Sequence, residues 1–96
     1  DNPELEMFKE FGDEEIKVLK LLKEELERCE WNSEDIGNAI PNSAKTIELS
    51  PRIAYFVAYK SLMGRSRGPR LAPILAEIER ERIIKIIEKC LIVINS

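Results

Sequence analysis

The sequence predicts an all-α fold, a compact bundle of about five helices. Apolar residues recur every three or four positions through most of the 96 residues, which is the spacing of one face of an α-helix. Cap residues, glycine and proline interrupt that pattern at intervals that suit short helices. The hydrophobic fraction is 44% and the charged fraction is 34%, a balance typical of a soluble globular protein. We therefore expect residues 1–96 to form a single all-helical domain.

The first long helix is predicted from an extended apolar stripe. Residues 3–11 suggest a short amphipathic turn or helix, which Gly12 breaks. Asp13 is suited to cap the next helix, because its carboxylate can accept hydrogen bonds from the exposed N–H groups of a first turn. Residues 16–29 follow the helical spacing and predict a helix of about four to five turns.

The second helix is predicted to be short. Asn32 or Ser33 can cap its start, and acidic residues follow in its first turn, where they favour the positive end of the helix dipole. Pro41 is expected to end or kink it, because the proline ring collides with the preceding turn. Residues 42–49 are therefore predicted to be a loop that could include one distorted helical turn.

The third helix has clear signals at both ends. Ser50 followed by Pro51 predicts a helix start, and the apolar pattern then continues to Met63. Gly64 is expected to stop this helix, because glycine takes a positive φ at little cost.

Two further helices are predicted after a turn. Gly68 with Pro69 is expected to begin a short helix whose apolar residues reach Ile78. Pro73 is tolerable there if it lies within the first turn. The last helix is predicted over residues 79–94, and its surplus of apolar residues is expected to pack on the core.

Positive charge gathers in the turn of residues 64–71, which we call the basic corner. Arg65, Arg67 and Arg70 fall within it, and Lys60 points towards it from the preceding helix. Guanidinium groups beside the N–H groups of a helix start suit an anion such as phosphate. An ordinary turn with solvated arginines would account for the same residues.

Charge is unevenly distributed along the chain, although the net charge is only −3. Residues 1–35 hold thirteen acidic side chains against five basic ones, whereas residues 36–70 hold one acidic against six basic. A polarised domain of this kind can present a basic surface while remaining acidic overall.

The sequence offers little to a catalytic mechanism. It contains no histidine, the commonest general base and metal ligand, so no catalytic residue, metal site or cofactor is predicted for this domain. Cys29 and Cys90 lack the spacing of a metal or redox motif and are expected to be buried, reduced thiols, which suggests a cytoplasmic protein. No apolar stretch is long enough to span a membrane. Binding is therefore favoured over catalysis.

Three short motifs occur in an order that matches a known family. Residues 59–71 place an aromatic-led, leucine-containing helix end before Gly-x-x-x-Gly-Pro-Arg-Leu. Residues 31–36 read Trp-Asn-Ser-Glu-Asp-Ile, and residues 81–83 read Glu-Arg-Ile. Together these resemble the C-terminal part of class I lysyl-tRNA synthetases over roughly residues 13–90. Glutamyl-tRNA synthetases carry a looser signature, and Arg70 directly after the proline favours the lysyl family.

This resemblance implies the C-terminal portion of a longer synthetase, a helical cage that binds the anticodon loop of tRNA-Lys. The catalytic domain, which uses ATP, would belong to the same parent chain and would be a second partner. By position, the tRNA-contacting residues would be Tyr59, Lys60, Arg65, Arg67 and Arg70. The residues that shape the motifs would be Trp31, Gly64, Gly68, Pro69 and Leu71. Tyr59 or Trp31 would either stack on an unpaired base or pack in the core.

A helical protein–protein interaction module without RNA binding is the alternative. The acidic first helix and the apolar last helix could then dock a partner domain. An exposed apolar patch on the last helix, with the arginines held in internal salt bridges, would favour this alternative. A small independent enzyme is disfavoured by the lack of histidine and of an activated nucleophile.

Overall fold

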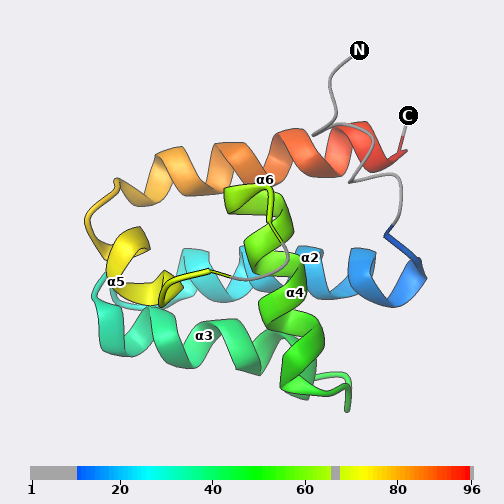
Figure 1. Cartoon of the computed structure of the whole chain (residues 1–96), viewed down its shortest axis with the longest axis horizontal. Helices are drawn as coiled ribbons and strands as arrows, with labels where there is room; N and C mark the ends of the chain where they lie inside the picture. The colour runs from blue at the N-terminus through cyan, green and yellow to red at the C-terminus, as the bar shows by residue number, and fades with distance from the viewer. Residues whose placement is uncertain (1–10, 66–67, 96) are drawn as a thin grey trace.

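The computed structural model describes residues 11–65 and 68–95, and within them five α-helices surround one apolar core (Figure 1). The helices are α2 (Asp13–Arg28), α3 (Ser33–Lys45), α4 (Pro51–Met63), α5 (Leu71–Ala76) and α6 (Arg80–Asn95). The predicted all-α class is confirmed. The helix or turn expected over residues 3–11 lies almost wholly outside the described residues.

The apolar face of α2 lies at the centre of the packing. Val18, Leu19, Leu22 and Leu26 are fully buried, as the helical spacing predicted. α3 and α6 pack against α2 from opposite sides, and α4 crosses it (Figure 1). Burial of each leucine side chain of this kind contributes about 1.5–3 kcal/mol to stability. Because α3, α4 and α6 all pack against α2, these side chains stabilise the position of three other helices.

The N-terminal caps of α2 and α3 differ, because only that of α3 uses a side chain. Gly12, not Asp13, is the N-cap of α2, and no side chain caps this helix. The prediction for Asp13 was wrong because the backbone already turns helical there; its charge still lies at the positive end of the helix dipole. Asn32 caps α3 as predicted, since its side-chain oxygen accepts a hydrogen bond from the N–H of Asp35 at 2.8 Å.

α3 does not end at Pro41. It continues to Lys45, so the loop predicted for residues 42–49 begins four residues later. Pro41 removes one donor from the helical ladder, but the following turn is held by burial of Ser43 and Ala44. The Ser43 hydroxyl also donates a hydrogen bond to the carbonyl of Ile40 at 2.6 Å. Tertiary packing has therefore overridden the local preference of proline.

α4 begins and ends as its sequence predicted. The Ser50 side chain accepts a hydrogen bond from the N–H of Arg52, and Pro51 occupies the first turn. Gly64 follows the last turn with a φ of 72°, the left-handed conformation that glycine adopts most readily.

α5 starts later than predicted. Its first residue is Leu71 and its N-cap is Arg70, so Gly68 and Pro69 precede the helix rather than begin it. The carbonyls of these two residues instead accept hydrogen bonds from the Tyr59 hydroxyl of α4. Pro73 is the third residue of α5, in the first turn, where a missing N–H costs little.

α6 carries one apolar residue that the core does not cover. Ile92 is 69% exposed, so the expectation that the apolar surplus of this helix packs on the core fails at this residue, whereas Leu91, Val93 and Ile94 are half-buried against the core. Cys90 is buried, and burial raises the pKa of its thiol to about 11. Cys29 is only half-buried, so the expectation of two buried thiols holds for one of them. Within residues 11–65 and 68–95, no helix is long and apolar enough to cross a membrane.

Gly37 lies inside α3 and offers a test of the packing between α3 and α5. A Cβ at this position would meet the Cβ of Ala72 at 3.6 Å, an ordinary contact. We expect Gly37→Ala to raise the free energy of unfolding by about 0.5–1 kcal/mol, because glycine loses more backbone freedom than alanine on folding. Urea unfolding followed by circular dichroism would measure the change.

Gly64→Ala is the matched control with the opposite sign. A Cβ at Gly64 has open space around it, but the φ of 72° is unfavourable for alanine. We expect a loss of about 1 kcal/mol in the same measurement. If Gly37→Ala lowered the free energy of unfolding, α3 and α5 would lie too close together at this position to accept a Cβ.

Candidate functional site

Tyr59 of α4 holds the basic corner in place. Its hydroxyl donates hydrogen bonds to the carbonyl of Pro69 at 2.5 Å and to that of Gly68 at 3.3 Å. Its ring lies beside Gly68, where an added Cβ would be 3.5 Å from the ring. The near end of the corner is tied to the same turn of α4, because the N–H of Arg65 donates to the Tyr59 carbonyl. One residue therefore fixes both ends of the corner.

The two arginines of the corner that the structure describes face solvent. Arg65 and Arg70 are exposed, and neither forms a salt bridge with any other residue in the described ranges. Lys60 is half-buried, with its Nζ 5.7 Å from the centre of the Phe56 ring. Arg67 lies outside the described residues. The salt bridges that the structure does describe join Lys23 to Glu27 and Glu88, and Arg28 to Glu25.

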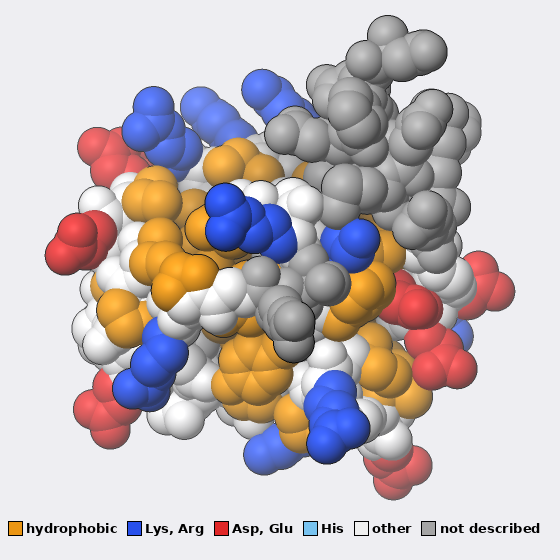
Figure 2. All heavy atoms as spheres, in the orientation of Figure 1, with side chains coloured by type: hydrophobic (Ala, Val, Ile, Leu, Met, Phe, Trp, Pro, Cys, Tyr) orange, Lys and Arg blue, Asp and Glu red, His pale blue; other side chains and the backbone are white. Residues whose placement is uncertain are grey.

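Figure 2 shows the face of the molecule on which α4 and the corner lie. Lys and Arg side chains lie across this face next to hydrophobic ones, while the Asp and Glu side chains lie towards its margins (Figure 2). Residues 49–76, which include α4, the corner and α5, contain no acidic residue at all. The positive charge of this face is therefore not neutralised from within its own segment.

Leu71 and Pro69, two further motif residues of the corner, differ in burial. Leu71 is buried and anchors the start of α5 in the core, whereas Pro69 is exposed. α5 has only six residues, and Pro73 supplies no N–H to its first turn. The expected contribution of a helix start to anion binding is thus small, and the arginine side chains are what an anion would contact.

Trp31 lies in a joint between distant segments, which we call the Trp31–Arg80 joint. The indole N–H donates a hydrogen bond to the carbonyl of Ile78 at 2.6 Å. The Arg80 guanidinium lies 5.3 Å from the Trp31 ring and donates a hydrogen bond to the carbonyl of Cys29 at 2.5 Å. The joint ties the end of α2 to the start of α6, so Trp31 serves the fold. Desolvation at this joint raises the pKa of the half-buried Cys29 thiol.

Arg80 and Tyr55 belong to none of the motifs from which functional residues were predicted. Arg80 acts through contacts with residues about fifty positions away, which no local pattern signals. Tyr55 occupies an apolar-rich helix but is 40% exposed, and its position on the outward side of α4 could have been inferred from the helical period.

Comparison with known proteins relates the chain to archaeal lysine–tRNA ligases. It is 37% identical to the Picrophilus torridus enzyme over 74 residues, which are 77% of this chain and 15% of that protein. It is 35% identical to the Thermococcus kodakarensis enzyme over 83 residues, 86% of this chain and 15% of that protein. The resemblance to lysyl-tRNA synthetases is confirmed. The Methanococcus maripaludis enzyme is 29% identical over 79 residues, which are 82% of this chain and 15% of that protein.

The chain spans about 15% of the length of these synthetases. It is therefore similar to only one portion of these enzymes, and it contains the corner and Trp31, on whose motifs the resemblance was based. No family model matches the chain. No solved structure matches it either.

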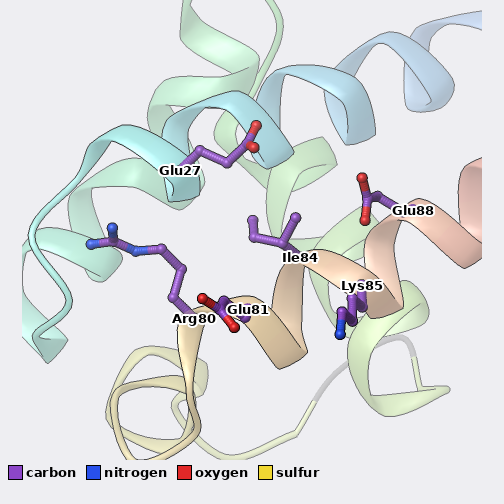
Figure 3. Close-up of a pocket in the computed structure, with 6 residues that line it drawn as sticks. All are labelled: Glu27, Arg80, Glu81, Ile84, Lys85 and Glu88. Carbon is purple, nitrogen blue, oxygen red and sulfur yellow. The ribbon is translucent and has the colours of Figure 1, made fainter.

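A shallow pocket lies next to the Trp31–Arg80 joint of this synthetase-like domain, between α2 and α6 (Figure 3). Its volume is about 310 Å³, and Arg80 extends from the start of α6 along one side of it (Figure 3). It is lined by Glu27, Arg80, Glu81, Ile84, Lys85 and Glu88. Its three carboxylates and two cations favour neither an anion nor a cation. Across the described ranges, no group of three or more Cys, Asp or Glu side chains could hold a metal ion.

The structural role of Trp31 can be tested with a smaller aromatic side chain that lacks the indole N–H. Trp31→Phe keeps an aromatic ring but leaves the Ile78 carbonyl without its donor. We expect the free energy of unfolding to fall by about 1–2 kcal/mol, measured by urea unfolding. A variant with unaltered stability would contradict this role.

Proposed function

We propose that this chain is the C-terminal, anticodon-binding domain of a class I lysyl-tRNA synthetase, and that the basic corner contacts the anticodon loop of tRNA-Lys. One observation carries the proposal. Arg65 and Arg70 project from the corner without a salt bridge to any residue in the described ranges, in a chain whose relatives are lysine–tRNA ligases.

The chemistry of the corner suits an RNA backbone. A guanidinium group presents several N–H donors in a planar fork that fits phosphate oxygens. Because Arg65 and Arg70 have no acidic partner among the described residues, binding a phosphate there would not require an existing ion pair to be broken. Arg67 and Lys60 would add charge at the same place. Backbone contacts of this kind position an RNA and account for most of the salt dependence of binding.

In the parent synthetase this domain would hold tRNA-Lys while a separate domain carries out aminoacylation. ATP would be bound by that catalytic domain, which would also be a partner of this one. This chain supplies binding groups rather than catalytic ones, since it contains no histidine.

A protein-docking role for α6 is the second candidate. Ile92 is 69% exposed beside a depression of about 470 Å³ between α2 and α6. It is lined by Lys20, Lys23, Glu24, Glu88, Leu91 and Ile92. This surface would suit contact with another part of the parent chain, and it leaves the corner available for RNA.

The corner can be tested by removing its guanidinium groups together. We expect Arg65→Ala, Arg67→Ala and Arg70→Ala in one variant to weaken binding of a tRNA-Lys transcript, measured by fluorescence anisotropy at several salt concentrations. Each lost phosphate contact should lower the slope of log affinity against log salt by about 0.7–0.9, so the slope should fall by about two. Circular dichroism would check that the variant is folded.

The matched control removes two exposed cations from α6, with Arg82→Ala and Lys85→Ala in one variant. Its affinity and salt slope should stay close to those of the unaltered chain. An equal loss in the control would mean that charge in general, and not the corner, governs binding. Unchanged affinity in the corner variant would refute the proposed site.

A further inference from the structure

We propose that the outward side of α4 extends the basic corner into a binding track for single-stranded RNA, with an unpaired base stacked on the ring of Tyr55. The track consists of Arg52, Tyr55 and the corner. This inference rests on the proposed function and adds to it a residue that contacts a base.

The helical period places the track on one side of α4. Arg52, Tyr55 and Tyr59 are three and four residues apart, so their side chains follow one another along the same face. The opposite face of α4 is buried in the core through Ala54, Val57, Ala58 and Ser61. Tyr59 ends the row where its hydroxyl meets the carbonyls of residues 68 and 69. A ligand that lies along this row would span about 10 Å of helix and then reach Arg70.

Tyr55 is more exposed than Trp31 and Tyr59, the two aromatic residues that the resemblance offers for stacking. The indole N–H of Trp31 and the hydroxyl of Tyr59 are both bound to backbone carbonyls, and both rings are half-buried against other segments. Tyr55 is 40% exposed, and among the described aromatic residues it alone exceeds the half-buried range. Every base has a face that can stack on such a ring, so this contact needs an unpaired base but no particular sequence.

Charge on either side of the ring favours RNA over a protein partner. The Arg52 side chain is exposed and forms no salt bridge with another described residue. At the other end of the row the Tyr59 hydroxyl binds the carbonyl of Pro69, and the exposed Arg70 follows Pro69 directly. No acidic residue occurs between residues 49 and 76, so nothing in this segment repels a phosphate backbone. An exposed aromatic ring between cationic groups is the arrangement that binds single-stranded nucleic acid through stacking and phosphate contacts.

The inference is tested with Tyr55→Leu, which removes the aromatic ring but keeps an apolar side chain. The probe is a fluorescein-labelled RNA hairpin that carries the anticodon loop of tRNA-Lys, and the comparison probe is a blunt RNA duplex of equal length. We expect Tyr55→Leu to weaken hairpin binding about tenfold, in line with the loss of one stacked base. Duplex binding and the thermal unfolding temperature should not change.

Two variants serve as controls. Tyr55→Phe retains the ring and should bind the hairpin with about the affinity of the unaltered chain. Ile92→Ala removes the other strongly exposed apolar side chain and should leave hairpin binding unchanged.

The outcomes separate this inference from the proposed function. If Tyr55→Leu binds the hairpin normally while the corner variant does not, the α4 track is wrong and the corner stands; the exposed ring would then be left for a protein partner. Equal weakening of hairpin and duplex binding would also overturn stacking on Tyr55. If neither variant affects binding, both the track and the proposed function fail.

Discussion

The burial of one face of α2 is the contact on which the rest of the fold depends. α3 and α6 pack on opposite sides of this face and α4 crosses it, so the same four apolar side chains position three helices (Figure 1). The Trp31–Arg80 joint adds a second link between the end of α2 and the start of α6. Because α4 packs on α2, the position of the corner that follows α4 depends on the core as well as on the corner's own residues.

Different residues of the corner and of α4 shape its backbone and carry its positive charge. Tyr59, Gly64 and Leu71 use a hydroxyl, a left-handed backbone and a buried side chain to set the course of the chain. Arg65 and Arg70 take no part in that framework through their side chains. A surface built in this way can vary its charged groups without disturbing the turn that carries them, and this is why the arginine variants are informative about binding.

Local chemistry was predictable from the sequence, and contacts between distant segments were not. Asn32 and Gly64 act at helix ends through bonds and dihedral angles of their own neighbourhood, and both predictions were right. Pro41 failed as a helix end because burial of the following turn outweighs one lost hydrogen bond. Pro69 failed as a helix start because Tyr59, from another helix, binds its carbonyl. Tyr55 was overlooked although the helical period places it on the side of α4 opposite the buried residues. The contacts of the predicted site residues with RNA stay predictions.

The uneven distribution of charge has a consequence for how a partner would arrive. Acidic side chains predominate in the N-terminal third of the chain and basic ones in its middle segment, although the net charge is only −3. The electric field of a distant polyanion would exert a torque on the domain. This torque would turn the exposed arginines of the corner towards the polyanion and the acidic side chains of α2 away from it. Such pre-orientation raises the rate of productive encounter, and added salt weakens it because exposed charges more than about 10 Å apart are largely screened at 0.1 M ionic strength. An overall acidic domain can thus meet a polyanion in a preferred orientation, whereas a uniformly basic one would be attracted from every side.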